Sequence, residues 1–251
     1  MAASPWATST RRPKRRPPTS NRRTPGETEL SLKRASRLNQ KKHREAERLF
    51  LAEGANLILE SGEPPRKLFS ELGEVRHLST LTTPTGPVGV FPFLDVTPEA
   101  LMAACQRLVL LHGVQDPGNV GTVIRCAHAF GAGVALSKGC ADLYNPKTVR
   151  ATMGSLFHAP VSRELDSLEF LEEADGTGFT TVAAVPAGGD TPRSLPDDRL
   201  VIIVGAEGAG LPREIVDASQ ARVTITSRAA SLNAAIAGSI LLYEAYMRVL
   251  P

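Results

Sequence analysis

In the C-terminal half of the chain, continuous apolar runs alternate with stretches of helical periodicity. Residues 108–114 form such a run and predict a buried strand. Val120, Val123, Ile124 and Ala127 follow at the spacing of one helix face and predict a helix. Further strands are predicted at 133–136, 179–185, 200–204 and 222–225, and further helices at 146–153, 165–173, 212–218 and 232–249. This alternation predicts an α/β fold with a mostly parallel sheet covered on both faces.

The preceding segment shows a shorter and different pattern. Residues 30–59 have helical periodicity with basic residues on the polar side, and a strand is predicted at 88–93. Thr97 followed by Pro98 predicts a helix start, with Thr97 as the cap. We therefore predict a disordered tail over 1–29, a small α/β domain over 30–100, a junction near 95–106 and a larger domain over 105–251.

Charge is distributed unevenly along the chain. Residues 1–50 contain 14 Lys and Arg against 4 Glu, a balance of +10, whereas the other 201 residues contain 15 Lys and Arg against 22 Asp and Glu, a balance of −7. A basic arm on an acidic body indicates a polyanionic partner. We expect phosphate contacts with RNA from these side chains: Arg11, Arg12, Arg15, Arg16, Lys41, Lys42 and Arg44.

The basic tail allows three interpretations. Residues 1–29 combine arginines and prolines with almost no aliphatic side chains, so a disordered RNA-binding tail is one. A mitochondrial or plastid transit peptide is another, although the proline density disfavours the helix that such a peptide needs. An inert solubilising tail is the third. We expect a cytoplasmic protein, or a mitochondrial matrix protein if the tail is a transit peptide.

Several classes of protein are disfavoured by composition. The longest apolar runs, such as 200–204 and 236–242, are too short to span a membrane, so a soluble protein is expected. Cys105, Cys126 and Cys140 are odd in number and contain no Cys-x-x-Cys pair, which predicts reduced, buried thiols. The histidines have no metal-ligand spacing, and no metal is expected.

Ligands of parallel α/β sheets bind beyond the carboxyl ends of the strands, and the first unusual loop at such a position is 112–121. This loop leads into a helix that bears Arg125. Asn119 and Arg125 are six positions apart, so we expect both to face the same end of the sheet. Taken alone, the pattern also fits a plain strand–turn–helix with a solvated arginine.

Two further loops carry candidate chemistry. The loop 204–212 contains three glycines, which allow close approach of the backbone to a ligand, but its spacing differs from the dinucleotide fingerprint. Glu207 within it would repel a phosphate and suits a cationic or hydroxyl-rich ligand. The loop 225–233 opens the last helix; Ser231 is a candidate cap, whereas Asn233 in the first turn is hard to explain structurally.

Together these loops resemble the motifs of the SpoU (TrmH-like) RNA 2′-O-methyltransferases of the SPOUT superfamily. The resemblance covers about residues 105–250, in order and at family-like spacing. The matching stretches are Gln115-Asp116-Pro117-Gly118-Asn119-Val120-Gly121 with Arg125, Gly205-Ala206-Glu207-Gly208, Ser231-Leu232-Asn233 with Leu241-Leu242-Tyr243-Glu244, and Lys138-Gly139-Cys140-Ala141-Asp142 through Asn145-Pro146-Lys147 to Arg150-Ala151. Nearer the N-terminus, Phe50-Leu51-Ala52-Glu53-Gly54 resembles the opening of the ribosomal-protein-like substrate-binding domain of many members.

The resemblance implies S-adenosylmethionine-dependent methylation of a ribose 2′-hydroxyl in structured RNA, ribosomal RNA being favoured over transfer RNA. It also implies a C-terminal trefoil knot that holds the cofactor, and a homodimer whose active site takes residues from both subunits. Carried over residue by residue, it assigns catalytic roles to Asn119, Arg125, Glu207, Ser231 and Asn233. It places the cofactor against Gly205, Glu207, Gly208, Ile225 and Leu232. Because a guanidinium holds its proton strongly, we expect Arg125 to clamp the substrate as a cation.

One segment departs from the family pattern. Ile225 is followed by Thr226-Ser227-Arg228, where members usually have Pro-Met, and the loop before Ser231 is shorter. Two alternatives therefore stay open. One is a non-catalytic RNA-binding relative, and the other is a nicotinamide-dependent Rossmann enzyme, against which the glycine spacing counts.

Overall fold

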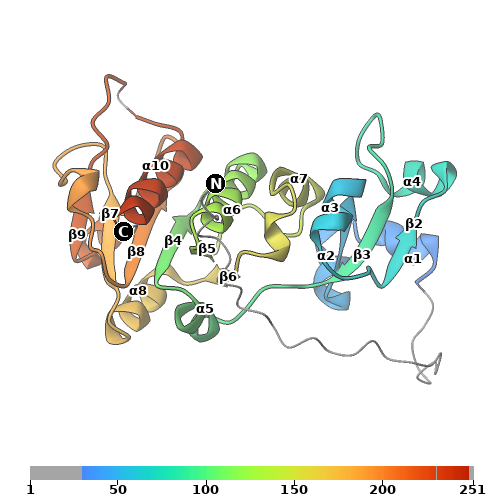
Figure 1. Ribbon diagram of the computed structural model, residues 1–251, viewed down its shortest axis with the longest axis horizontal. Coiled ribbons are helices and arrows are strands. Elements are labelled where there is room, and N and C mark those ends of the chain that lie inside the picture. Colours follow the sequence, from blue (N-terminus) through green and yellow to red (C-terminus); the bar gives the residue numbers. More distant parts are fainter. Residues whose placement is uncertain (1–29, 230, 249–251) are drawn as a thin grey trace, which may run out of the picture. The chain divides into compact units, whose positions relative to one another are not determined.

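The computed structural model describes residues 30–229 and 231–248, and the chain from Ser31 onward belongs to one compact unit. This unit contains two sheets and their covering helices (Figure 1). The predicted tail over 1–29 lies outside the described residues. So do four of the predicted RNA contacts: Arg11, Arg12, Arg15 and Arg16.

A six-stranded sheet occupies the C-terminal part of the unit. Its order is β6-β5-β4-β8-β7-β9, and every neighbouring pair is parallel, as the sequence predicted. The strands are β4 (Arg107–His112), β5 (Gly133–Ser137), β6 (Val161–Leu165), β7 (Thr180–Ala184), β8 (Leu200–Gly205) and β9 (Ala221–Val223). The edge strand β6 was not predicted, because polar Ser162, Arg163 and Glu164 interrupt its apolar pattern.

Helices cover both faces of this sheet (Figure 1). They are α5 (Pro98–Ala104), α6 (Pro117–Ala129), α7 (Pro146–Ala151), η1 (Ser155–Phe157), α8 (Ser167–Gly176), η2 (Pro192–Ser194), α9 (Arg213–Ala218) and α10 (Ala234–Met247). Val109 and Leu111 of β4 pack in the layer that contains α6 and α10, whereas Leu108 and Leu110 pack in the layer with α5 and α8. Burial on both faces explains why this strand is a continuous apolar run in the sequence.

A three-stranded antiparallel sheet precedes the parallel one, in the order β1-β3-β2. Its elements are α1 (Leu32–Arg37), α2 (Lys41–Glu47), β1 (Leu49–Glu53), α3 (Ala55–Glu60), β2 (Lys67–Phe69), α4 (Leu72–Leu78) and β3 (Val88–Pro92). The continuous helical pattern predicted over 30–59 is wrong. Arg48 has a φ of 53° and ends α2, and all five residues of β1 are then buried in extended conformation.

The two sheets share one apolar core. Phe50 and Phe91 belong to the same buried cluster as Val109 and Leu111 of β4. Aromatic rings continue this core: the ring centroids of Phe50 and Tyr144 are 4.9 Å apart. The domain limits predicted near 95–106 stay a prediction, since buried apolar contacts run from one sheet to the other.

All three cysteines carry free thiols, and burial raises the pKa of Cys105 and of Cys140. Across residues 30–229 and 231–248, no three His, Cys, Asp or Glu side chains are grouped so that they could hold a metal ion. None of the helices in these two ranges combines the length and the apolar character that crossing a bilayer requires.

Candidate active site

The three loops singled out in the sequence leave the parallel sheet at its carboxyl edge. β4 and β8 are hydrogen-bonded neighbours with His112 opposite Gly205, so their loops begin side by side. β7 lies between β8 and β9, and the Val185 N–H donates to the Val223 carbonyl at 2.9 Å. Neighbouring strands therefore bring segments together that lie far apart in the sequence.

One side chain from each loop joins a chain of hydrogen bonds, here called the amide–carboxylate chain (Asn233, Asn119 and Glu207). Asn233 Nδ2 donates to Asn119 Oδ1 at 3.1 Å, and Asn119 Nδ2 donates to Glu207 Oε1. The start of α10 fixes the direction of donation along this chain. Asn233 Oδ1 accepts the N–H groups of Ala235 and Ile236 at 2.9 and 3.2 Å, so only its Nδ2 group is left to bind Asn119, as a donor. The exposed Glu207 carboxylate is thus the final acceptor.

The same contacts correct the expected helix cap. α10 begins at Ala234 and its N-cap is Asn233, whose side chain accepts two backbone N–H groups. The prediction that Ser231 caps this helix is wrong; Ser231 is exposed and lies two positions before the cap. Asn233, hard to explain from sequence, therefore has both a structural role and a contact with Asn119. A catalytic role for Ser231 stays a prediction.

The backbone of Asn119 is bound by Asp116, a residue whose Asp-Pro-Gly sequence predicts a turn. Asp116 is the N-cap of α6, and its Oδ1 accepts the Asn119 N–H at 2.9 Å. This N–H holds the pKa of the Asp116 carboxyl below its ordinary value, and Lys147, whose Nζ is 3.5 Å from Asp116 Oδ2, lowers it further. An Asp directly before Pro117 is a helix-start signal that would have found this role.

The glycine-rich loop after β8 is folded tightly upon itself. The Gly210 N–H donates to the Ala206 carbonyl at 2.9 Å, and a Cβ on Gly205 would lie 2.3 Å from the carbonyl carbon of Gly210. Gly208 has a φ of +81°, which side chains rarely adopt. The glycines are therefore required by the shape of the loop, which presents Glu207 to solvent.

Arg125 lies on α6 outside the amide–carboxylate chain. It is exposed, and no hydrogen bond or ion pair links it to another of the residues that the structure describes. Six helical positions turn the side chain through about 600°, so Arg125 points about 120° away from Asn119 around the helix axis. A single chain therefore does not bring these two predicted catalytic side chains together.

The remaining predicted cofactor residues flank an exposed segment. Ile225 and Leu232 are partly buried, and Ile225 packs against the core. Between them, Arg228 is exposed, and the Ala229 N–H donates to Ser227 Oγ at 3.0 Å. This part of the site combines apolar side chains with a short hydroxyl-bonded turn.

The predicted RNA contacts on α2 have different surroundings. Arg44 is only 3% exposed; it donates to the Leu38 carbonyl at 2.7 Å and to Asp142 Oδ2 at 2.5 Å. A buried and paired guanidinium offers nothing to a phosphate, so the prediction is wrong for Arg44. Lys41 is exposed and pairs with Glu164 at 2.7 Å, and Lys42 is exposed.

A second polar network joins the two sheets, and we call it the junction network (Arg44, Asp142, Asp95, Tyr144, Arg163 and Glu45). The Tyr144 hydroxyl accepts the N–H groups of Leu94 and Asp95 at 2.6 and 2.7 Å and donates to Asp95 Oδ1 at 2.6 Å. Burial and the Asp95 carboxyl raise the pKa of Tyr144, which keeps this donor protonated. Arg163 binds Glu45 through two nitrogens at 2.8 and 2.9 Å.

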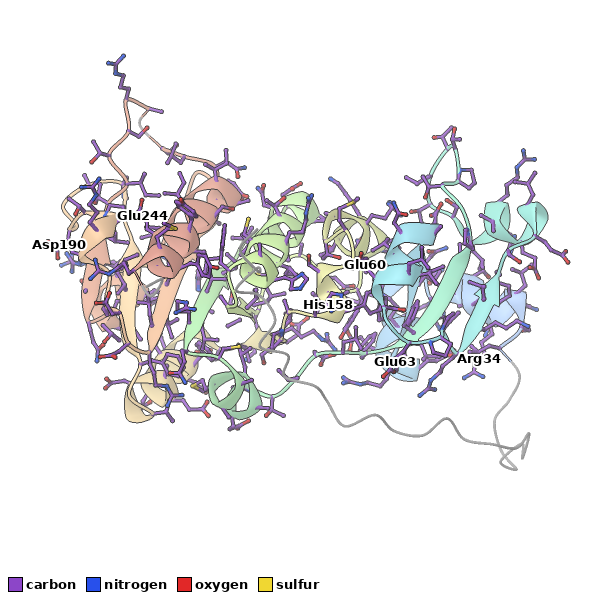
Figure 2. All side chains as sticks on the ribbon, viewed as in Figure 1. Arg34, Glu60, Glu63, His158, Asp190 and Glu244 are labelled. Carbon is purple, nitrogen blue, oxygen red and sulfur yellow. The ribbon has the colours of Figure 1, made fainter. Side chains whose placement is uncertain are left out.

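The junction also contains a cleft of about 470 Å³. Its charged lining consists of three cation–carboxylate pairs: Lys41 with Glu164, Arg48 with Asp95, and Arg163 with Glu45. A separate pair is formed by Glu60 of α3 and His158 after η1, which lie side by side with 3.5 Å between Oε2 and Nε2 (Figure 2). Because the charges of the cleft are balanced, it has no excess of positive charge for an anion.

Known proteins resemble this chain over most of the described structure. A model of the SpoU rRNA Methylase family matches residues 106–243. A Bacillus subtilis 23S rRNA (guanosine(2553)-2′-O)-methyltransferase is 36% identical over 59% of this chain. The match spans 60% of that relative's length. A Synechocystis protein named as an uncharacterized tRNA/rRNA methyltransferase is 33% identical, and the match covers 80% of this chain and 70% of that protein.

Similarity extends to the fold. The structure of an AdoMet-bound rRNA methyltransferase from Sinorhizobium meliloti superposes with a TM-score of 0.79 at 31% identity, covering 88% of this chain and 95% of that protein. The family match also disfavours the alternative of a nicotinamide-dependent enzyme. The matched segment contains the loops after β4 and β8 and the amide–carboxylate chain, and the chain belongs to the SpoU rRNA methylase family.

Proposed function

We propose that this chain transfers a methyl group from S-adenosylmethionine to a ribose 2′-hydroxyl in structured RNA, and that the RNA is ribosomal. The observation that carries the proposal is the amide–carboxylate chain, which unites the three family motifs at the carboxyl edge of the sheet. The Bacillus relative is named as a 2′-O-methyltransferase of 23S rRNA, and the Sinorhizobium protein as an rRNA methyltransferase.

The residues of the site fit such a cofactor. When bound, it supplies a methyl group on a positively charged sulfur. Glu207 offers a carboxylate to ribose hydroxyls or to the positive charge, and its bond from Asn119 fixes its orientation. Ile225 and Leu232 supply partly exposed apolar surface beside it. The cofactor contacts proposed are therefore Gly205, Glu207, Gly208, Ile225 and Leu232.

Catalysis at this site rests on alignment and charge. With S-adenosylmethionine bound beside Glu207, the cofactor would supply the methyl group to the 2′-oxygen and would keep the electron pair of the carbon–sulfur bond, while the hydroxyl proton would leave to solvent. Orientation of the reacting groups can supply several kcal/mol of the barrier reduction. Arg125, charged and exposed, would hold the substrate phosphate and stabilise the developing negative charge on oxygen.

We also propose a homodimer in which Arg125 completes the partner's site. Within one chain Arg125 does not meet the amide–carboxylate chain, as shown above. Ile236, Tyr243 and Met247 are exposed on α10 and lie seven and four positions apart, so they share one apolar face of the helix. A second copy of the chain would bury this face.

The trefoil knot expected from the resemblance belongs to the same proposal. Two loops are bound closely to each other: Gly189 N–H donates to Thr224 Oγ1 at 2.9 Å, and Thr224 N–H donates to the Asp190 carbonyl at 2.8 Å. These contacts support a path in which the chain after β9 runs against the loop after β7. A crystal structure that traces residues 185–233 as an unthreaded path would contradict it.

Calorimetric titration with S-adenosylmethionine is the first test of the function. Micromolar binding is the expected result. RNA binding without cofactor binding would instead identify a non-catalytic relative, for which the altered 226–230 sequence would be responsible.

The Arg125→Lys variant tests the role of the guanidinium. Because lysine keeps the charge but lacks the planar pair of donors, we expect about a tenfold or greater loss of methyl transfer with unchanged cofactor binding. Full activity in this variant would contradict the bidentate clamp.

Mixing two inactive variants tests the shared site. Arg125→Ala and Asn119→Ala each disable one half of a proposed composite site, so a mixed dimer contains one intact site. We expect activity to return when the two are refolded together, and light scattering to give the mass of two chains. A monomeric mass, or no recovery of activity, would overturn the dimer. Mapping 2′-O-methylation in total RNA with and without the protein would then identify the target nucleotide.

A further inference from the structure

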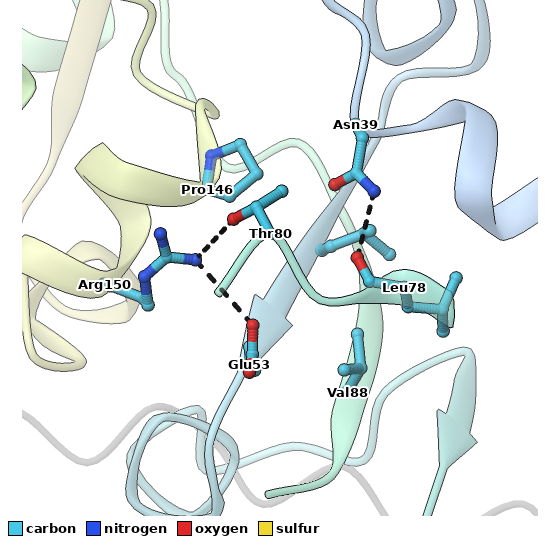
Figure 3. A pocket seen from close by; sticks show the side chains of 8 residues that line it. Asn39, Glu53, Leu78, Thr80, Val88, Pro146 and Arg150 are labelled. Atoms are coloured by element: carbon cyan, nitrogen blue, oxygen red, sulfur yellow. Dashed lines mark hydrogen bonds and ion pairs between the residues drawn. The ribbon is translucent and has the colours of Figure 1, made fainter. Parts of the chain in front are cut away.

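Two stretches that resemble family sequence, yet lie outside the proposed catalytic site, meet in the structure. Glu53 ends β1, and Arg150 lies on α7, 97 positions later. Arg150 Nη1 is 3.8 Å from Glu53 Oε2 and donates to Thr80 Oγ1 at 3.1 Å (Figure 3). These contacts join the antiparallel sheet to the catalytic part of the chain.

Glu53 closes the loop between α4 and β3, residues 79–87. The Ser79 hydroxyl lies 2.8 and 2.9 Å from the two carboxylate oxygens, and the Thr85 N–H donates to Oε1 at 3.0 Å. The Leu81 N–H donates in turn to Ser79 Oγ at 3.0 Å. One carboxylate, itself 7% exposed, therefore holds both ends of the 79–87 loop.

Through α7, Arg150 connects this loop to α6, the helix that carries Asn119. α7 packs directly on α6: a Cβ on Gly121 would lie 2.4 Å from the Ala151 Cβ and 3.0 Å from the Thr148 carbonyl oxygen. Asn119 lies in the first turn of α6, two positions before Gly121. The 79–87 loop is therefore connected to Asn119 in two steps: the ion pair between Glu53 and Arg150, and the close packing of α7 on α6.

The 79–87 loop has the chemistry of a phosphate contact. Thr80, Thr82, Thr83 and Thr85 are exposed and offer hydroxyl donors, and no carboxylate interrupts the loop. Hydroxyl side chains and backbone N–H groups are common contacts to the nucleic-acid backbone, where they fix register without reading sequence. Such a contact is useful only if the loop is held at a constant position relative to the reacting atoms.

We propose that Glu53 and Arg150 are positioning residues that hold the 79–87 loop as a docking surface for the RNA substrate, in fixed relation to Asn119. This inference rests on the proposed function. It predicts that breaking the pair weakens RNA recognition while cofactor binding and the chemical step are retained. RNA long enough to reach the loop will depend on the pair, and a short fragment carrying only the target nucleotide will not.

The test compares Glu53→Gln, Arg150→Gln, Arg150→Lys and the Glu53→Gln/Arg150→Gln double variant. We expect the KM for long RNA to rise about tenfold in both single Gln variants, while kcat stays within about twofold of the unaltered protein. This pattern is expected when a contact that binds the substrate and the transition state equally is lost. The double variant should match the single ones, because they remove the same interaction. Arg150→Lys should recover part of the KM, since it keeps the charge.

Amide hydrogen exchange supplies a readout that does not depend on activity. In Glu53→Gln, we expect the Thr85 amide to exchange at least tenfold faster while the amides of α6 are unchanged. Glu47→Gln is the matched control, because Glu47 loses the same charge in the same part of the chain but pairs with Arg34 instead. It should alter neither KM nor the exchange of Thr85.

Each result has a defined meaning. Equal losses for long and short RNA, or a fall in kcat with KM unchanged, would overturn the positioning role, as would normal exchange at Thr85. Failure of the proposed function itself is separate: the unaltered protein would then neither bind S-adenosylmethionine nor methylate RNA, while the exchange result could still hold.

Discussion

The amide–carboxylate chain and the junction network are both polar, yet they differ in burial and charge. The first consists of two neutral amides and one exposed carboxylate at loop ends. The second contains buried or half-buried charges that are paired, such as Arg44 with Asp142. Polar groups kept at the surface stay available to a ligand, whereas charges taken out of water must be satisfied by the protein itself.

This contrast predicts that the two networks respond differently to substitution. Loss of a junction group should lower the free energy of unfolding strongly, because it leaves a partner buried and unpaired. Loss of a group in the amide–carboxylate chain should cost little stability and much activity.

Arg44→Met should be the most destabilising change. Methionine keeps part of the apolar volume but leaves Asp142, 12% exposed, without its cation. Breaking one partner of a buried pair costs about 3–5 kcal/mol, to be measured by urea unfolding. Lys41→Met is the control, because its pair with Glu164 is about half exposed on both sides and should cost at most about 1 kcal/mol. Equal effects of the two would refute the distinction.

Tyr144→Phe removes a single oxygen from the junction network. The N–H groups of Leu94 and Asp95 then lose their acceptor, which should cost about 1–3 kcal/mol in the same measurement. The exposed Thr83 gives a control, since Thr83→Val also removes one hydroxyl and should change stability by less than about 0.5 kcal/mol. If Tyr144→Phe lowered the free energy of unfolding by less than the control does, a water molecule would have replaced the Tyr144 hydroxyl as acceptor.

Asn233 allows its two roles to be separated. Asn233→Ala should lose the cap of α10, about 1 kcal/mol, together with methyl transfer. Asn233→Asp keeps the cap, so its stability should stay within about 0.5 kcal/mol, but it lacks the amide that donates to Asn119. We expect activity to fall in both variants. An active Asn233→Asp protein would show that the hydrogen bond to Asn119 is dispensable.

Asp116→Asn should have the smallest effect, which is present at neutral pH and disappears in acid. The folded-state pKa of Asp116 lies below its ordinary value of 3.8, so the charged cap stabilises the fold above that pH and the contribution is lost as pH falls through the folded pKa. Because the side chain is about half exposed, a few tenths of a kcal/mol are expected. We therefore expect the melting temperatures of the two proteins to differ at pH 7 and to converge as the pH is lowered through the folded-state pKa. A difference that stays the same at every pH would exclude this role.

The parallel sheet could be predicted from sequence because burial on both faces makes strands such as β4 and β8 continuously apolar. The strand β1 was missed because five buried residues lie between two short helices and merge with their periodicity. Among site residues, Asn119, Glu207 and Asn233 could be named from motifs and the structure brings them together. Their order of donation could not be predicted, since it depends on which residue begins α10.

The role of Arg44 shows the other limit of the sequence. A basic residue on the polar side of a predicted helix resembles a solvated one, and only the fold places Asp142 beside it, 98 positions away. Likewise the contact between Glu53 and Arg150 depends on how α7 meets β1, which no local pattern encodes.

The aromatic core shared by the two sheets has a consequence for how the protein folds. Phe91 and Phe157, one from each side of the junction, pack edge to face with ring centroids 4.9 Å apart. Neither part can complete its interior alone, so the described fold should be gained and lost in a single cooperative transition. A segment that resembles a separable accessory module should therefore be thermodynamically inseparable from the parallel sheet on which it packs.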